Sequence, residues 1–419
     1  MNMKIMIICP SMYPNMRNWG ETQRMYYLAN YLTKNGCEVL TISPWFDDKG
    51  TEERLQLYKS FFLGEKSKVV KSDKMVNSKE NLARRIRHKL AQIANFLSEK
   101  ITGETPFVEV LKKRRWIRKY KRQICEFICN NDIDIVIISA PSFSLLSLCK
   151  AIKKYRYNIK LVFDYRDPWY LWKGNNFSYF SEKKYLKRAD AMVGFSKAFT
   201  DDMIEKYHLE KIPTQTVYNG YSAESWEHFL EKNNFYNHQN KKMVITYTGM
   251  IYLADRKDNY RNLARLIDIV NSLNKVELYL VGVVGQKEAE IKGNVHYIGN
   301  VSQEESFRYM MNSDVLLSIH DTNDNSQKYI VSGKFYDYVK SGKYLFHIGA
   351  KDSLMCKMIE ENGLGMSCRN ESEELESTIK NMILQWGNGT LERNHNEEFV
   401  SFFDRDFQNE KYLHFLEKL

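Results

Sequence analysis

The sequence predicts an α/β protein with two Rossmann-like domains, each a doubly wound parallel sheet, and with the two sheets facing a central cleft. Three observations predict this fold. The chain has 419 residues, which is long for one domain and ordinary for two. Short apolar runs alternate with longer helical patterns along nearly the whole chain, as parallel α/β layers require. A polar segment without periodicity, 233–242, separates the two sets of runs.

Each expected strand is a short apolar run, rich in β-branched and aromatic residues, and such runs favour buried central strands. Helical patterns fill the gaps between the runs. In the first half we expect strands at 3–9, 38–43, 133–139, 160–164, 191–195 and 214–218, and in the second at 243–249, 276–282, 294–298, 314–319 and 344–348. The expected helices include 21–34, 142–154, 198–207, 259–273, 303–312 and 333–341.

The same pattern sets the domain limits. We expect a first domain over 1–220, with a basic helical insertion at about 79–122, and a linker over 221–242. A second domain is expected over 243–390, followed by a helical tail over 391–419. Ligands of doubly wound sheets bind beyond the carboxyl ends of the strands, so candidate site residues are sought there.

Cysteines and hydropathy favour a cytoplasmic protein. The seven cysteines are scattered and lack the spacing of a zinc site, so we expect free thiols in a reducing compartment and no metal. No run of 18 apolar residues is present for a membrane span. The apolar run Ile5–Cys9 stops at Pro10, and we expect it to form the first strand rather than a signal peptide.

The positive charge is concentrated in one stretch. Residues 79–122 contain 14 Lys/Arg and four acids, which accounts for the whole net charge of +10. Apolar residues at helical spacing run through the stretch, opposite a cationic face. Core-packed helices with solvated charge are one interpretation. Attraction to anionic lipid is the other, since solvated faces are usually mixed in sign. The expected membrane contacts are Arg84, Arg85, Arg114, Arg115, Arg118 and Lys119.

The first candidate site is the turn after the first strand. Gly20 precedes a helix expected to begin near Glu21, and a glycine there lets a ligand approach the backbone at a helix N-terminus that favours anions. We therefore expect Gly20 to contact the donor. A plain structural turn would look the same. The turn is not the G-x-G-x-x-G fingerprint, so no nicotinamide cofactor is expected.

A second candidate site follows the strand KLVFDYRDPWY. Asp164, Arg166 and Asp167 are three ionisable groups within four residues at the end of that strand, where protonation can be tuned. We expect them to be catalytic. The alternative is a salt-bridged loop that only orders the strand end.

The third candidate site is the helix in SGKFYDYVKSG. Ser332 is a natural N-cap and Gly342 a natural stop. Lys334 and Asp337 are three residues apart and share a helix face. A cation beside free backbone N–H groups suits a diphosphate, and a carboxylate one turn deeper suits the paired hydroxyls of a ribose. An exposed ion pair on a surface helix is the alternative.

His320 and Asp321 follow the strand 314–319 and are also expected near the ligand. The acidic group Asp321, Asn323 and Asp324 resembles a metal-binding triplet. Its strand–helix context is wrong for such a motif, so no metal is expected.

Several segments together resemble retaining glycosyltransferase family 4 and its capsule and lipopolysaccharide relatives, which have the GT-B fold. The resemblance runs almost end to end and rests on LTKNGCEVLTIS after Gly20, DYRDPW, ADAMVGFSKAFTDDM, VYNGYS, ITYTGMIY, VELYLVG, IGNVSQEESFRYMMNSDVLLSI and GKFYDYVKSGKYL.

The resemblance implies that the second domain binds a nucleotide sugar, that the first binds the acceptor, and that neither metal nor cofactor is needed. It places Gly249 in the donor site, with Arg256, Lys257 and Arg261 as alternative cations for the diphosphate. Two departures stand out. The family's paired glutamates are replaced by Tyr329 and Asp337, and its first-domain histidine by the Arg166 region.

The expected activity is transfer of a sugar from a nucleoside diphosphate sugar to a growing, lipid-linked bacterial surface glycan such as capsule, O-antigen or exopolysaccharide. The enzyme would lie at the inner face of the cell membrane. A nucleotide-sugar 2-epimerase of the same fold is one alternative. A non-enzymatic nucleic-acid binder acting through 79–122 is another, although the sequence contains no recognised nucleic-acid module and we expect no nucleic-acid partner.

Overall fold

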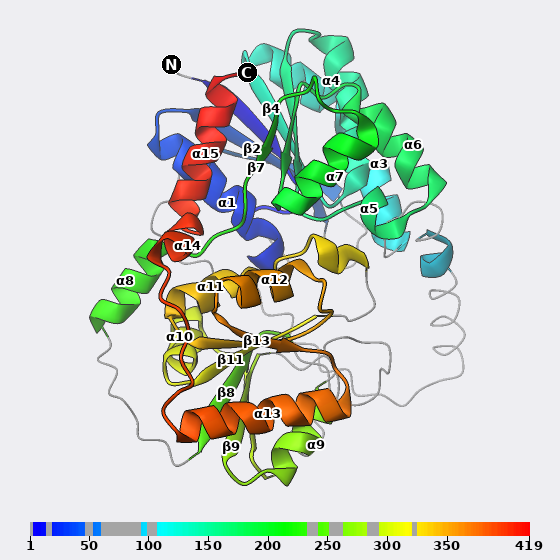
Figure 1. Cartoon of the computed structure of the whole chain (residues 1–419). Coiled ribbons are helices and arrows are strands. Elements are labelled where there is room, and N and C mark those ends of the chain that lie inside the picture. The colour runs from blue at the N-terminus through cyan, green and yellow to red at the C-terminus, as the bar shows by residue number, and fades with distance from the viewer. Residues whose placement is uncertain are drawn as a thin grey trace, which may run out of the picture. The chain divides into compact units, whose positions relative to one another are not determined.

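The computed structural model describes residues 3–13, 19–46, 53–59, 94–98, 107–232, 242–250, 263–282, 293–320 and 325–419 (Figure 1). The chain divides into two compact units. The first contains Met1–Tyr218 together with Asn409–Leu419, and the second contains Asn219–Gln408.

The first unit is built on a seven-stranded sheet of order β3-β2-β1-β4-β5-β6-β7. Six strands are parallel, and β3 alone pairs antiparallel with β2 at the edge. The strands are β1 (Lys4–Ile8), β2 (Glu38–Phe46), β3 (Glu53–Lys59), β4 (Ile135–Ala140), β5 (Lys160–Tyr165), β6 (Ala191–Gly194) and β7 (Thr214–Thr216).

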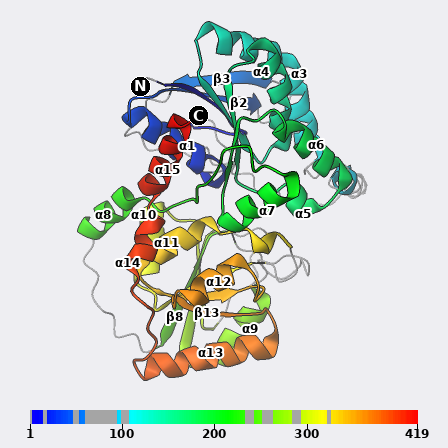
Figure 2. The ribbon, with the colours of Figure 1, turned by 45° about the horizontal axis from the view of Figure 1, so that its top comes forward.

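Helices cover both faces of this sheet. Met25, Leu28 and Leu32 of one helix pack on the buried side chains of β1 and β4, together with Tyr412 and Phe415 from near the end of the chain. These residues belong to α1 and α15, whereas α3 and α4 lie on the other face (Figures 1 and 2). The helices are α1 (Trp19–Lys34), α3 (Phe107–Asn130), η1 (Phe143–Leu148), α4 (Cys149–Tyr155), α5 (Tyr170–Lys173), α6 (Asn176–Leu186), α7 (Lys197–Tyr207) and α15 (Arg405–Glu417).

The second unit is built on a six-stranded parallel sheet of order β10-β9-β8-β11-β12-β13. Its strands are β8 (Met243–Thr248), β9 (Val276–Val281), β10 (Val295–Gly299), β11 (Val315–Ile319), β12 (Tyr344–Ile348) and β13 (Gly365–Cys368). In Figure 2, α11 and α12 lie on one face and α9 and α13 on the other. The helices are α8 (Ala223–Lys232), α9 (Ala264–Ser272), α10 (Gln303–Met311), η2 (Asn325–Lys328), α11 (Gly333–Ser341), α12 (Leu354–Glu361), α13 (Ser372–Gly387) and α14 (Glu397–Phe402).

The two doubly wound parallel sheets confirm the predicted fold class. Two strands were absent from the prediction. Strand β3 is a charged edge strand, ERLQLYK, and β13 has only four residues, GMSC. Both lack the long apolar run that marks a central strand.

The unit limits also differ from the expected domains. The predicted linker 221–242 contains α8, a ten-residue helix of the second unit, and residues 233–241 lie outside the described residues. The predicted tail 391–419 is divided, with 391–408 in the second unit and 409–419 in the first. The division follows burial, because Tyr412, Phe415 and Leu416 belong to the apolar core of the first sheet.

Candidate functional site

Two glycines meet at the carboxyl ends of β8 and β9. The Gly249 amide donates to the carbonyl of Val281 at 2.7 Å, and the Gly282 amide donates to the carbonyl of Gly299 at 2.8 Å. Gly249 has a φ of +120°, which L side chains rarely adopt, and a Cβ on Gly282 would lie only 1.8 Å from the carbonyl oxygen of Gly249. The sheet edge therefore exposes bare backbone at this point, as close approach of a ligand requires.

Lys334 fills the space beside Gly249. A Cβ on Gly249 would lie 2.8 Å from Lys334 Nζ, so the absent side chain makes room for the ammonium group. The same Nζ is 3.6 Å from the ring centroid of Tyr247, at the end of β8. A cation on an aromatic face is attracted by the ring quadrupole. Lys334 and Gly249, both predicted donor residues, are thus brought together.

Helix α11 is fixed to the end of β8 by Tyr338. The Thr248 amide donates to the Tyr338 hydroxyl at 3.0 Å, and burial raises the pKa of Tyr338 to about 12. Ser332 occupies the N-cap with extended backbone, but its side chain makes no capping hydrogen bond, contrary to the prediction. Its hydroxyl is buried and without a hydrogen-bond partner in the described part of the chain. Gly342 ends the helix with a φ of +76°, as predicted.

Asp337 lies one turn further along α11 and is half-buried. The indole Nε1 of Trp226, in α8, donates to its Oδ1 at 3.0 Å. Burial raises the pKa of the Asp337 carboxyl, while the Trp226 hydrogen bond and the positive charge of Arg405 lower it. Asp337 is thus held by a buried aromatic ring, which is not the arrangement of an exposed i,i+3 ion pair.

His320 directly follows β11 and is 8% exposed. Its backbone amide donates to the carbonyl of Ile348 at 2.8 Å, and its ring meets that of His347 edge to face at 5.4 Å. It therefore lies at the same sheet edge as Gly249, although within the protein interior. The predicted residues Arg256, Lys257, Arg261 and Asp321 lie outside the described residues.

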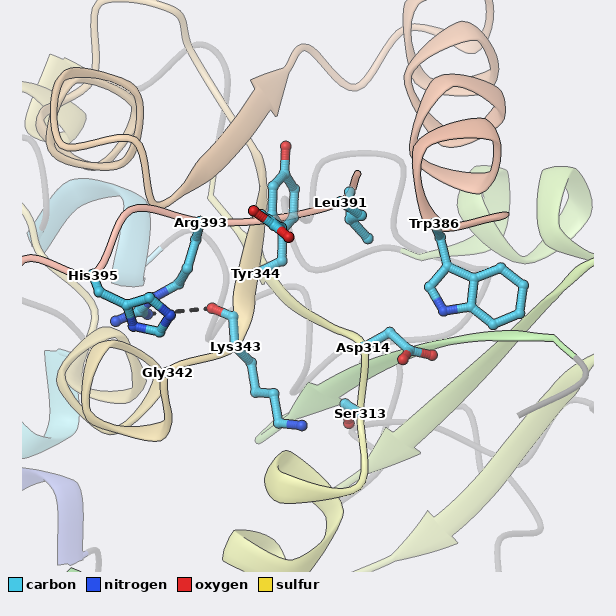
Figure 3. A pocket seen from close by; sticks show the side chains of 10 residues that line it. Ser313, Asp314, Gly342, Lys343, Tyr344, Trp386, Leu391, Arg393 and His395 are labelled. Carbon is cyan, nitrogen blue, oxygen red and sulfur yellow. Dashed lines mark hydrogen bonds between the residues drawn. The ribbon is translucent and has the colours of Figure 1, made fainter. Parts of the chain in front are cut away.

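A cavity of about 410 Å³ opens at the opposite, amino edge of this sheet (Figure 3). Residues Asp314, Lys343, Tyr344 and Trp386 line it. Arg393 also lines the cavity, and its guanidinium donates to the carbonyl oxygens of Lys343 at 3.3 Å and Val339 at 3.1 Å. These bonds satisfy carbonyls near the end of α11, so Arg393 has a structural role there. None of the predicted donor residues lines this cavity.

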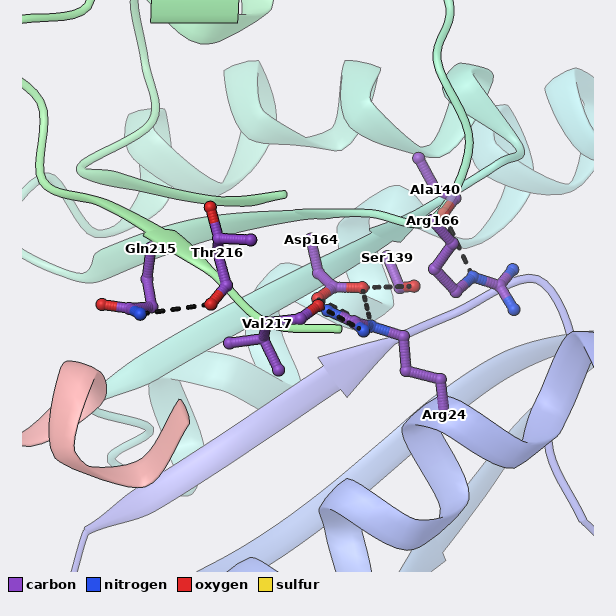
Figure 4. A network of polar contacts seen from close by, with 8 residues as sticks. All are labelled: Arg24, Ser139, Ala140, Asp164, Arg166, Gln215, Thr216 and Val217. Atoms are coloured by element: carbon purple, nitrogen blue, oxygen red, sulfur yellow. Dashed lines mark hydrogen bonds and ion pairs between the residues drawn. The ribbon is translucent and has the colours of Figure 1, made fainter. Parts of the chain in front are cut away.

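In the first unit, Asp164 is fully buried. It lies within a network of polar contacts (Figure 4). Arg24 of α1 donates from Nη2 to Asp164 Oδ2 at 2.9 Å and from Nε to Oδ1 at 3.2 Å, and Ser139 also donates to Oδ1 at 3.3 Å. The remaining Arg24 nitrogen, Nη1, reaches the carbonyl of Val217 at 2.9 Å. Asp164 was predicted to be catalytic. These contacts instead place it inside the unit as the partner of a buried arginine, with no exposed surface for substrate.

Arg166 and Asp167 lie nearer the surface of the same strand end. Arg166 donates from Nε to the carbonyl of Ala140 at 3.1 Å and from Nη1 to the carbonyl of Glu21. Its Nη2 is buried and has no hydrogen-bond partner among the described residues. Burial raises the pKa of Asp167 to about 6, against the lowering effect of Arg166. Gly20 lies in the first turn of α1, which begins at Trp19 rather than Glu21, and the next residue, Glu21, accepts from Arg166 through its backbone carbonyl.

The cationic helix α3 packs through an apolar stripe that includes Val110, Trp116 and Ile124. Arg115, Arg118 and Lys119 are exposed, and the guanidinium of Arg114 lies 5.9 Å from the ring centroid of Phe177 in α6. Arg84 and Arg85 lie outside the described residues. Large apolar side chains are exposed on the same group of helices: Phe107, Val108, Leu111, Trp172, Phe177 and Phe180.

Sequence reasoning missed Arg24 and Trp226. Arg24 contacts Asp164 across 140 residues of sequence, and no local pattern links the two. Trp226 was assigned to a linker, although the amphipathic segment AESWEHFLEK could have identified its helix.

Among the described residues, no group of three or more His, Cys, Asp or Glu could hold a metal ion. Likewise, no helix in the described ranges is long and apolar enough to cross a membrane.

Residues 20–225 match a family model described as Glycosyltransferase Family 4, whereas no curated protein matches the chain. Among solved structures, the chain is similar to a glycosyltransferase from Rickettsia africae ESF-5, with 13% identity, a TM-score of 0.60 and coverage of 100% of this chain and 98% of that one.

It is also similar to Anabaena Alr3699/HepE, solved in complex with UDP and glucose, with 14% identity, a TM-score of 0.57 and full coverage of both chains. A putative UDP-N-acetylglucosamine 2-epimerase from Listeria monocytogenes shares 14% identity over 100% of this chain and 98% of that one, with a TM-score of 0.52. The chain therefore has the two-domain GT-B fold, and its residues 20–225 are similar to Glycosyltransferase Family 4.

Proposed function

We propose that this chain is a glycosyltransferase that takes a sugar from a nucleoside diphosphate sugar and transfers it with retention of configuration. One observation carries the proposal. The ammonium of Lys334 lies against the bare backbone of Gly249, at the N-terminus of α11 and the carboxyl ends of two parallel strands. A helix N-terminus, a cation and a glycine-lined edge together form a site for a diphosphate.

The proposed chemistry depends on departure of the diphosphate. Negative charge on this leaving group grows as the sugar–oxygen bond breaks, and Lys334 with the first amides of α11 stabilises that charge. Arg256, Lys257 and Arg261 are the further cations that we propose for the same group. No protein nucleophile is required, because the acceptor hydroxyl transfers its proton to the departing phosphate. In this proposal the reaction needs neither a metal ion nor a cofactor.

Asp337 is proposed to hold the ribose of the donor. An ionised carboxylate accepts hydrogen bonds from two neighbouring hydroxyls at once. Its position one turn beyond Lys334 on α11 suits a nucleotide whose diphosphate lies at the helix N-terminus. His320, at the end of β11, is proposed to line the same site.

The acceptor is proposed to bind to the first unit, where Arg166 and Asp167 lie at one sheet edge. Gly20, in the first turn of α1, is proposed to contact the donor. We propose a lipid-linked surface glycan, such as capsule, O-antigen or exopolysaccharide, as the acceptor, and the cytoplasmic face of the cell membrane as the place of reaction. The cations of α3 beside the exposed aromatic side chains of α5 and α6 support this proposal. Such surfaces combine insertion of aromatic rings with attraction to anionic lipid.

Calorimetric titration of the purified protein with UDP, GDP, CDP and dTDP sugars tests the donor assignment. We expect one base to bind with micromolar affinity and to raise the melting temperature. Absence of binding by every nucleotide sugar would contradict the proposal. The similarity to the Listeria structure favours one alternative, a 2-epimerase. Epimer formation from the bound sugar without any acceptor would establish that alternative.

The membrane assignment has its own test. Replacement of Arg114, Arg115, Arg118 and Lys119 by Gln should release the protein from vesicles that contain phosphatidylglycerol. Each basic residue near an anionic surface contributes about 1 kcal/mol of attraction, which salt weakens. Donor binding should not change. The matched control replaces four exposed cations of the second unit, Lys351, Lys357, Arg369 and Lys380, by Gln. Equal loss from both variants would remove α3 from the contact.

A further inference from the structure

The indole of Trp226 is fixed in an aromatic cluster within the second unit. Trp226 is 1% exposed, and its ring stacks on Phe307 of α10 with centroids 4.1 Å apart and an interplanar angle of 20°. Phe229, one turn along α8, meets the Trp226 ring edge to face at 5.9 Å and the Phe307 ring at 5.5 Å. With both neighbours in van der Waals contact, the direction of the indole N–H is set by packing.

That N–H points at one oxygen of the proposed ribose carboxylate. A tryptophan indole can only donate, and burial without an acceptor would be costly. Nε1 donates to Asp337 Oδ1 at 3.0 Å, which satisfies the indole and fixes the carboxyl plane. No side chain of the described residues hydrogen-bonds to Oδ2, so this second oxygen remains able to accept from a ligand.

Burial raises the pKa of the same carboxyl, and the Trp226 hydrogen bond and the Arg405 charge oppose that effect only in part. Arg405 is itself held by the backbone at the start of the second unit. Its guanidinium donates to the carbonyl of Gly220, and its amide donates to the carbonyl of Tyr221 at 3.0 Å.

We propose that Trp226 is a positioning residue for the donor: by binding Oδ1 of Asp337, it directs Oδ2 toward the paired 2′- and 3′-hydroxyls of the nucleotide ribose. This inference rests on the proposed function, since it needs a nucleotide at α11. It extends that function to a residue of α8, which lies 111 positions before Asp337 and outside the Lys334 helix. Selectivity for ribose over 2′-deoxyribose then depends on a side chain that does not touch the sugar.

The test compares UDP with 2′-deoxy-UDP, and GDP with 2′-deoxy-GDP, by calorimetry. The wild-type protein should bind the ribonucleotide about tenfold more tightly than its deoxy analogue, the scale of one charge-assisted hydrogen bond. Trp226→Phe keeps the stacked ring and removes the N–H. It should weaken ribonucleotide binding about tenfold, leave the deoxy analogue within about twofold, and so abolish the preference. In an Asp337→Asn background, Trp226→Phe should have no further effect.

Phe229→Leu is the matched control, because it disturbs the same aromatic cluster but leaves the indole N–H in place. It should lower the melting temperature and retain the preference for ribose. If Trp226→Phe does not fold, site-specific replacement of the indole by benzothiophene, in which sulfur takes the place of the N–H, makes the same change without altering the ring shape. That variant should also lose the preference.

The outcomes separate the two proposals. A wild-type protein that binds no nucleoside diphosphate contradicts the proposed function itself. If the wild-type protein binds the ribonucleotide and its 2′-deoxy analogue equally, Asp337 does not bind the ribose, and the inference about Trp226 is overturned. A normal preference in the Trp226 variant overturns only that inference and leaves the donor site intact.

Discussion

The carboxyl ends of strands in the two sheets hold charged residues in opposite kinds of surroundings. At the end of β5 in the first unit, the charges of Asp164 and Arg24 are paired inside the protein, at 0% and 9% exposure. At the end of β8 in the second unit, the charge of Lys334 lies against a glycine and an aromatic face. The two places differ in whether bare backbone lies beside the charge, so ionisable residues at a strand end do not by themselves indicate a ligand site.

The largest effect is expected from the buried pair. Asp164→Asn leaves the Arg24 charge without its partner in the interior, which should reduce the free energy of unfolding by about 3–5 kcal/mol. Urea unfolding followed by circular dichroism measures this loss. The double variant Arg24→Met, Asp164→Leu removes both charges and should recover most of it. An unchanged unfolding midpoint in Asp164→Asn would show that the pair does not stabilise the fold.

Lys334→Ala should lower kcat by roughly 10²–10³, the scale for removal of one preorganised electrostatic contact, while the KM for the donor changes much less. The reason is that, in the proposed reaction, the diphosphate beside Lys334 carries more negative charge in the transition state than in the bound donor. Steady-state kinetics measures kcat and the donor KM separately. Lys340→Ala, on the last turn of the same helix and above the ring of Tyr221, is the control and should retain normal kcat. Equal kcat in both variants would remove Lys334 from catalysis.

Asp337→Asn should weaken nucleotide-sugar binding by about 1–3 kcal/mol, because a neutral amide oxygen replaces a charged acceptor. The fold should be retained, since asparagine has the same shape and still accepts from Trp226. Isothermal titration measures the affinity, and a melting curve checks the fold. A donor affinity equal to that of the wild type would show that the ribose binds elsewhere.

The smallest effect is expected at Asp167, and its sign is opposite to that at Asp164. Burial raises the pKa of Asp167 to about 6, so the folded state holds this proton more tightly than the unfolded state. Ionisation therefore reduces stability as the pH rises from about 4 to 6. Asp167→Asn should raise the melting temperature at pH 7 by about 2 °C or less, with no difference below pH 4. A lower melting temperature at pH 7 would mean that Asp167 is stabilised by a partner.

The sequence was sufficient for features that local pattern encodes. Eleven apolar runs located eleven of the thirteen strands in the described residues, and the serine and glycine around GKFYDYVKS marked α11 with the correct bounds. The edge strand β3 was missed because ERLQLYK mixes charged and apolar residues. An edge strand with one neighbour tolerates such a sequence, and that position is a property of the sheet rather than of the segment. The short strand β13 depends on pairing with β12 for the same reason.

The chemistry of the candidate sites was less predictable, because it depends on contacts between distant segments. Asp164, Arg166 and Asp167 are ionisable residues at the end of one strand, and nothing in the local sequence separates them. Only the contact of Asp164 with Arg24 of α1 shows that Asp164 belongs to a buried ion pair. Asp337 was placed within the correct helix, whereas Trp226 required knowledge of how α8 packs on α10 and α11.

The assignment of residues 409–419 to the first unit has a consequence for biosynthesis. Tyr412, Phe415 and Leu416 complete the apolar layer over β1 and β4, yet the ribosome makes them only after all of the second unit. Domains of most multidomain chains fold in order of synthesis, amino-terminal domain first. In this chain, residues 1–218 have part of their apolar surface uncovered until the second unit and residues 409–419 have been synthesised. Nascent chains halted before residue 409 should therefore depend on chaperones that bind this open face.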